Sequence, residues 1–179
     1  MKTINNAHSF LIIFVSGLLA TFVMMLIGFW QAGIGLNAID MGVMLAGSMT
    51  ATHPELPYGL WVGNIAHFGV GVLLAFIYAA FLQASMPGGW LVRGVSYAIV
   101  VELVATVIVL PLVTRTGVFF LNTDEPGMMM ISTFVPHLFY GVSLTLAMKV
   151  AGLEPVRAEA QAPAPTRREV GYPEPLATG

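Results

Sequence analysis

The sequence contains no cysteine and very little charge. None of its 179 residues is cysteine, and only 9% are Asp, Glu, Lys or Arg, against about 25% in an average soluble domain. Without cysteine the chain forms no disulfide, no thiolate metal site and no covalent c-type haem attachment. Its net charge of −2 provides none of the basic character that nucleic-acid binding needs. We therefore expect no nucleic-acid partner, and the low charge argues against a soluble globular domain.

Signatures of catalysis are missing as well. The sequence has no P-loop, no Gly-x-Ser-x-Gly and no His-Glu-x-x-His motif. Asp40 and Asp124 lie between the apolar segments, but neither has a nucleophile and a base beside it. We therefore predict that the protein is not an enzyme.

Long apolar runs dominate what is present. Apolar residues make up 57% of the chain, and a membrane-crossing helix needs about 20 of them in succession. Backbone groups in lipid must bond within their own segment, so each such run is expected to be a helix. We predict an all-α, integral membrane four-helix bundle, whose spans are residues 9–30, 58–83, 95–114 and 128–150.

The connections divide the chain into two parts. Residues 1–152 form the predicted transmembrane domain, in which the apolar stretch 38–50 suggests a short interfacial or re-entrant helix. The short turn at Met86–Gly89 indicates that the second and third spans are an antiparallel pair. Residues 153–179 form a Pro/Ala-rich tail, which by composition needs a partner to be ordered.

Lys and Arg are distributed unevenly over the two sides of the predicted bundle. With four crossings only Arg115 falls on one side, and the other side carries Lys2, Arg93, Lys149, Arg157, Arg167 and Arg168. Because cytoplasmic segments are enriched in Lys and Arg, we expect both termini, including the tail, to be cytoplasmic.

Two spans share a short pattern that suggests an internal repeat. His67-x-x-x-Gly71-Val72-x-Leu74 in the second span matches His137-x-x-x-Gly141-Val142-x-Leu144 in the fourth. A unit of two spans repeats in parallel, with its axis along the membrane normal. We predict a parallel two-fold repeat that places both histidines at similar depth.

The two histidines lie on faces of small residues with a spacing of four. Such faces allow membrane helices to approach closely, so both imidazoles are expected to face the bundle interior. One interpretation is that His67 and His137 are the axial ligands of a b-type haem. The alternative is that each ring only forms a hydrogen bond between helices.

Two further polar side chains lie within the spans. Glu102 is costly in lipid unless it is protonated or paired, and we expect it to be neutral or to pair with His67 or His137. Glu102 and Asn64 are candidates for buried polar groups with a structural or proton-linked role. Pro136 removes a helical hydrogen bond and so frees the carbonyl of Ser132.

Methionine is plentiful, with 11 residues in the chain. Thioether and imidazole groups suit Cu(I), although methionine also fills apolar space adaptably. Copper handling, or transport through a water-accessible cavity reaching Glu102 and the histidines, is therefore a further interpretation.

Several ordered pieces of sequence resemble an uncharacterised family of small bacterial four-span membrane proteins. The resemblance runs from Gly17 to Gly152 and rests on Ala20–Met25, Asp40-Met41-Gly42, His67-Phe68 with Gly71, Tyr78-Ala79-Ala80, Arg93-Gly94 with Tyr97, and His137 with Tyr140-Gly141. It implies a four-helix membrane fold in the bacterial inner membrane and no particular activity. Glu102 departs from the family pattern, which has an apolar or aromatic residue at that place.

The leading functional hypothesis is a non-catalytic accessory subunit of a larger membrane complex, specifically a respiratory or electron-transfer complex. Its apolar faces would contact lipid and other membrane subunits, and residues 153–179 would bind a partner. The alternatives are a haem b electron carrier using His67 and His137, and a small transporter or copper-handling protein.

Overall fold

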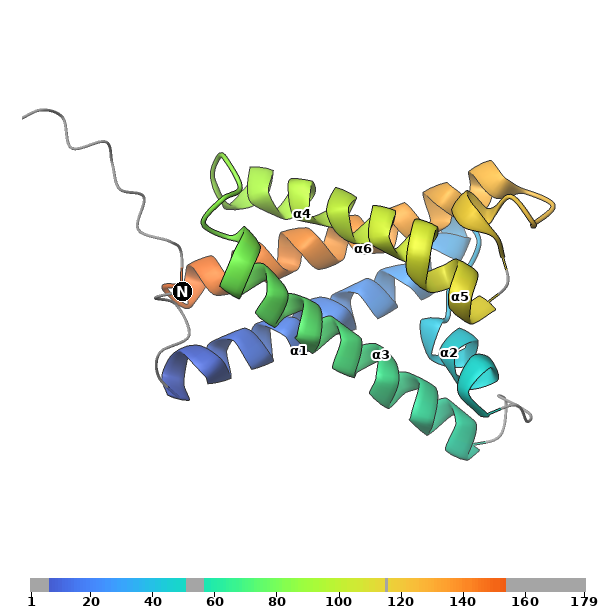
Figure 1. Ribbon diagram of the computed structural model, residues 1–179, viewed down its shortest axis with the longest axis horizontal. Helices are drawn as coiled ribbons and strands as arrows, with labels where there is room; N and C mark the ends of the chain where they lie inside the picture. The colour runs from blue at the N-terminus through green and yellow to red at the C-terminus, as the bar shows by residue number, and fades with distance from the viewer. Residues whose placement is uncertain (1–6, 51–56, 115, 154–179) are drawn as a thin grey trace, which may run out of the picture.

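A computed structural model describes residues 7–50, 57–114 and 116–153 (Figure 1). Four helical stretches are long and apolar enough to cross a membrane. They are Ala7–Ile34, Trp61–Leu82, Trp90–Thr114 and Pro126–Val150. The described residues contain helices and turns but no strand, so the predicted all-α bundle with four spans is confirmed. Residues 154–179 of the predicted tail lie outside the described residues.

The helices follow the predicted order. They are α1 (Ala7–Trp30), α2 (Met41–Thr50), α3 (Pro57–Ile77), α4 (Trp90–Val104), α5 (Leu110–Thr114) and α6 (Pro126–Val150). A 3-10 turn extends α1 to Ile34, and a π-helical turn extends α3 to Leu82. A second π-helical turn, Ala105–Val109, joins α4 and α5 into one continuous span. The short helix predicted over 38–50 begins at Met41, after Asp40 caps it through a 3.0 Å bond to the amide of Val43.

The third span begins at Trp90, five residues before the predicted start at residue 95. The sequence-based boundary kept Arg93 outside the span, since an isolated charge is costly in lipid. In the structure Arg93 is buried, and its Nε donates a 3.3 Å hydrogen bond to the carbonyl of Met86. A partner at the end of the helix therefore allows the charge to lie within the first turn.

The central pair of the bundle is α1 and α6, with α3 packed on α1 and α4 packed on α6. The predicted pairing of the second and third spans is only partly correct. They run antiparallel, but α3 and α4 make few contacts and diverge from the turn that joins them (Figure 1). At their far ends α2 packs on α3 and also contacts α5. A gap therefore remains between α3 and α4 within the spans.

Glycine determines which helices approach closely. A Cβ atom on Gly71 of α3 would collide with Thr21 of α1, and one on Gly141 of α6 would collide with the backbone of Gly94 in α4. Close backbone approach at small residues is the usual basis of packing between membrane helices. The prediction that the two small-residue faces point into the bundle is therefore confirmed.

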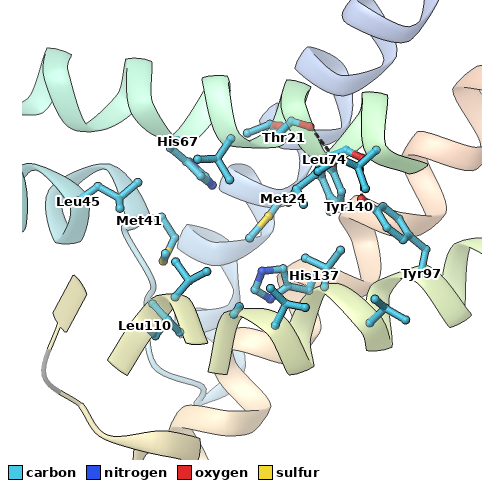
Figure 2. A pocket seen from close by; sticks show the side chains of 18 residues that line it. Thr21, Met24, Met41, Leu45, His67, Leu74, Tyr97, Leu110, His137 and Tyr140 are labelled. Atoms are coloured by element: carbon cyan, nitrogen blue, oxygen red, sulfur yellow. Dashed lines mark hydrogen bonds between the residues drawn. The ribbon is translucent and has the colours of Figure 1, made fainter. Parts of the chain in front are cut away.

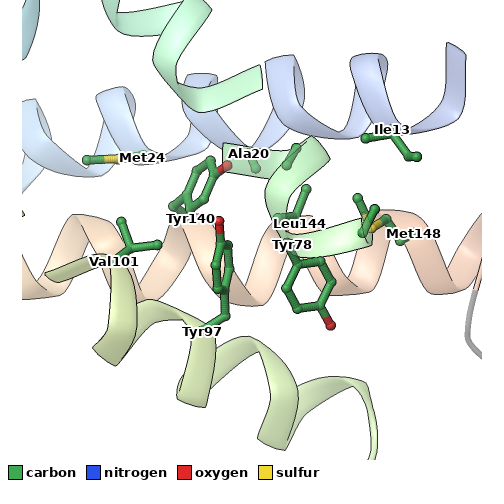
Figure 3. Close-up of a cluster of buried hydrophobic side chains, with 11 residues drawn as sticks. Ile13, Ala20, Met24, Tyr78, Tyr97, Val101, Tyr140, Leu144 and Met148 are labelled. Carbon is green, nitrogen blue, oxygen red and sulfur yellow. The ribbon is translucent and has the colours of Figure 1, made fainter. Parts of the chain in front are cut away.

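Tyrosine side chains connect the divergent helices through the core (Figure 3). The hydroxyl of Tyr97 donates to the carbonyl of Leu74 at 2.7 Å, and that of Tyr140 donates to the carbonyl of Gly71 at 2.6 Å. Both side chains are 1% exposed, and a buried tyrosine hydroxyl needs such an acceptor. These two bonds tie α4 and α6 to α3 on one side of the gap.

The carbonyl freed by Pro136 is satisfied from another helix. Gln31 follows α1, and its Nε2 donates to Ser132 O at 2.8 Å and to Asn37 O at 2.6 Å. The backbone amide of Asn37 donates to Ser132 Oγ at 3.0 Å. The carbonyl of Ser132, which Pro136 leaves free in the fourth span, therefore holds the connection between α1 and α2 in place through Gln31.

We expect Gln31→Met to lower the free energy of unfolding by about 1–3 kcal/mol, because it leaves buried carbonyls without a donor. Steric trapping in mild detergent would measure the change. Pro136→Ala restores the amide that pairs with Ser132 O in a regular helix. The loss of unfolding free energy caused by Gln31→Met should therefore be smaller when Pro136→Ala is also present. Equal losses with and without Pro136→Ala would contradict the hydrogen bond from Gln31 to Ser132 O.

Candidate intramembrane binding site

A cavity of about 280 Å³ lies between α3 and α4. The other walls come from α1 and α6, and residues of α2 and α5 line the end where α3 and α4 are farthest apart. The polar side chains at its surface are Thr21, His67, Tyr97, His137 and Tyr140. All other lining residues are apolar: Met24, Met41, Leu45, Val70, Gly71, Leu74, Ile77, Val100, Val101, Val104, Ala105, Val109 and Leu110.

The cavity opens on the outside of the bundle between α3 and α4. Val70 on α3 is 47% exposed, and Val100 and Val104 on α4 are 39% and 42% exposed. These three side chains both line the cavity and belong to the apolar outer surface of the spans. In a membrane, lipid therefore has direct access to the cavity from the side.

His67 faces this cavity because the small residues around it contact two different helices. One turn before it, Gly63 packs against Gly42 in α2, and one turn after it, Gly71 packs against Thr21 in α1. His67 lies between these two contacts, at a part of α3 that is covered neither by α1 nor by α2. Its side chain is 6% exposed, and neither ring nitrogen has a hydrogen-bond partner among the described residues.

His137 faces the same cavity from α6, but its environment is different. Its Nδ1 lies 2.6 Å from Oε2 of Glu102 and 2.9 Å from the carbonyl of Thr133. Thr133 Oγ1 donates to the other carboxylate oxygen, Oε1, at 2.8 Å. Glu102 is thus paired with His137 and not with His67. The pair leaves Nε2 as the ring nitrogen that a ligand in the cavity can use.

The two imidazoles lie at similar positions along their helices. His67 is ten residues from the start of α3 at Pro57, and His137 is eleven from the start of α6 at Pro126. At about 1.5 Å per residue both lie roughly 15 Å from the helix ends. A hydrocarbon core is about 30 Å thick, and both rings lie within the membrane-spanning stretches, at least one helical turn from either end. Figure 2 shows both rings directed into the same space.

The remaining predicted residues lie outside the cavity. Glu102 is buried but is not part of the lining, so this cavity does not reach the carboxylate, as transport was predicted to require. Asn64 was predicted to be buried, whereas it is half-buried on α3 and its amide packs against Gly42 of α2. The absence of a side chain at Gly42 makes room for that amide.

Four lining residues were not identified as site residues from the sequence. Tyr97 and Tyr140 form part of the wall, and Met24 and Met41 contribute thioether groups from α1 and α2. Figure 2 shows the Met24 side chain entering the space between the two histidines. Methionine and tyrosine also occur throughout the apolar sequence, so no local pattern separated these four from core residues.

Conventional metal binding finds no support in the described residues, which contain no cluster of three or more His, Asp or Glu side chains suited to an ion.

The chain matches no protein-family model, no curated protein and no solved structure.

Proposed function

We propose that this protein binds a lipid-soluble small molecule inside the membrane, in the cavity between α3 and α4. One observation carries the proposal. His67 is almost fully buried within its span, faces the cavity, and has no hydrogen-bond partner for either ring nitrogen among the described residues. An unsatisfied buried polar group costs about 1–3 kcal/mol, and a bound molecule with its own polar atom would remove that cost.

The route into the cavity supports the same proposal. The rim residues Val70, Val100 and Val104 are apolar and exposed to the surrounding lipid. A molecule dissolved in the bilayer reaches the histidines without crossing water. Ligand sites generally combine an apolar wall with a few polar groups that fix orientation. Here the wall is almost wholly apolar, and the two imidazoles are the polar groups that we propose fix the ligand's orientation.

Filling the cavity should abolish binding. Ala105 lines it from the π-helical turn, whereas Val107, two residues later, is 39% exposed and outside it. We expect a small molecule to co-purify with the wild-type protein and Val107→Phe, and to be lost from Ala105→Phe. Native mass spectrometry of protein purified from its own membrane would measure this. The proposal would be contradicted if no small molecule co-purified with the wild-type protein, or if Ala105→Phe and Val107→Phe carried equal amounts of it.

Copper handling is a second candidate, favoured by the thioethers of Met24 and Met41 beside the two imidazoles. These are soft ligands that suit Cu(I). Copper analysis of the same preparations tests this candidate: stoichiometric copper that depends on Met24 and Met41 but not on Met25 would support it.

The role as an accessory subunit of an electron-transfer complex remains a proposal. Large exposed apolar side chains along the spans, such as Trp61 at 71% and Leu112 at 80% exposure, suit either lipid or partner helices. Co-migration of other subunits during mild purification would support this role. The haem b hypothesis also remains a proposal, and a reduced-minus-oxidised spectrum of the purified chain tests it.

The internal repeat and the orientation are proposals of the same kind. In each half of the chain, the glycine four residues after the histidine lies at a close helix contact: Gly71 on α1 and Gly141 on α4. This correspondence supports a doubled two-helix unit. The Lys and Arg distribution supports cytoplasmic termini in a bacterial inner membrane.

A further inference from the structure

We infer that the molecule bound between α3 and α4 is a membrane quinone, with its ring in the cavity that His67 and His137 line and its tail leaving through the lateral opening. This inference rests on the proposed function, since it names the chemical class of the ligand for that site. Three properties of the cavity lead to it: the depth of the polar groups, their hydrogen-bonding capacity, and the shape of the opening.

The depth of the histidines excludes most lipids. Both rings lie roughly 15 Å from the starts of their helices by helix rise and within the membrane-spanning stretches, inside a hydrocarbon core about 30 Å thick. A phospholipid carries its polar atoms in the headgroup at the membrane surface, and its acyl chains offer no hydrogen bond. The ligand therefore needs polar atoms within an otherwise apolar body, as a quinone ring has.

The hydrogen-bonding capacity of the two rings matches both redox forms of such a molecule. A neutral imidazole has one N–H donor and one acceptor nitrogen, and within the described ranges both are unpartnered in His67. With Glu102 ionised and His137 protonated, the Nε2–H of His137 donates to a carbonyl. With a neutral His137 whose one proton is on Nδ1, facing Glu102 and the carbonyl of Thr133, Nε2 instead accepts from a hydroxyl. A quinone has two carbonyl oxygens on opposite sides of its ring, and a quinol has two hydroxyls.

The shape of the cavity agrees with a ring and an extended tail. Its volume of about 280 Å³ is slightly below the roughly 300–1,000 Å³ of sites that enclose drug-sized ligands. A single substituted ring fits such a space, but a complete isoprenoid quinone does not. The exposed rim residues Val70 and Val104 place the remaining apolar chain in the bilayer between α3 and α4.

Binding of decylubiquinone to the full-length protein in synthetic phosphatidylcholine nanodiscs tests this inference. We expect saturable binding of one molecule per chain, weakened about tenfold or more by His67→Leu, since about 1.4 kcal/mol corresponds to a factor of ten. The control His8→Leu removes an exposed histidine outside this cavity, and its affinity should equal that of the wild type. Decylbenzene, which has the tail and a ring but no carbonyl, should bind at least tenfold more weakly than decylubiquinone.

A second readout does not depend on whether the His67 variant folds. The infrared carbonyl band of ¹³C-labelled decylubiquinone should move to lower frequency in nanodiscs with wild-type protein, compared with nanodiscs of lipid alone. An unshifted band would overturn the inference, as would equal affinities for decylubiquinone and decylbenzene.

The outcomes separate this inference from the proposed function. If decylubiquinone does not bind but Ala105→Phe still removes a co-purifying molecule, the quinone assignment fails and the binding function stands. If that molecule is replaced by stoichiometric copper, the quinone assignment is overturned in favour of a metal. If the wild type carries nothing and binds neither probe, both proposals fail.

Discussion

Replacing His137 by leucine is expected to destabilise the protein by about 3 kcal/mol or more, because it leaves the Glu102 carboxylate buried without its ion-pair partner. Glu102 is 4% exposed, and its Oε2 lies 2.6 Å from His137 Nδ1. Among the described residues, only the 2.8 Å bond from Thr133 Oγ1 to Oε1 would remain on the carboxylate. Steric trapping in bicelles would measure the free energy of unfolding.

A double variant distinguishes loss of the ion pair from loss of packing. In Glu102→Leu/His137→Leu both charges are gone, and apolar replacement of a buried ion pair is often neutral or stabilising. We expect the double variant to recover at least half of the cost of His137→Leu. If the two substitutions are simply additive, Glu102 and His137 do not act as a pair. His8→Leu, at an exposed position, should leave stability unchanged.

Gly141→Leu is expected to cost more than about 3 kcal/mol, beyond the 1–3 kcal/mol typical of overpacking. The first added carbon already collides with the carbonyl oxygen of Gly94 and approaches Ala98. These are backbone atoms and a methyl group, so α4 and α6 must move apart to admit the side chain. The change should appear as a lower thermal midpoint in detergent and as weaker cross-linking between α4 and α6.

Gly69→Leu is the matched control for this substitution. Gly69 also lies in a membrane-spanning helix, α3, but a Cβ atom there would meet nothing within 4 Å. Leucine should be tolerated at this position, with a thermal midpoint close to that of the wild type. Equal losses at Gly69 and Gly141 would show that helix propensity, and not the contact with α4, determines the effect.

Much of the fold follows from properties that act along a single helix. The low charge and the four apolar runs were sufficient to predict the spans, because lipid requires each segment to satisfy its own backbone. The spacing of four residues around His67 and His137 predicted that both rings face inward. Pro136 likewise predicted a free carbonyl at Ser132, which follows from the missing amide alone.

The candidate site itself was not predictable in this way. The sequence left open whether Glu102 pairs with His67 or His137, because both lie at similar depth. It indicated that the second and third spans pair through their short turn, whereas α3 packs on α1 and α4 packs on α6. The cavity exists because of this different pairing.

Hydrophobic periodicity, proline and small-residue spacing thus determined the number of spans, their helical nature and the faces they bury, since each depends on one segment in its solvent. Tertiary structure alone decided which faces meet, because most apolar side chains can pack against one another. Close contacts, such as those of Gly71 with Thr21 and of Gly141 with Gly94, determine which helices pair. Those contacts set α3 and α4 apart and leave His67 facing an apolar space, with no hydrogen-bond partner in the part of the chain that the structure describes.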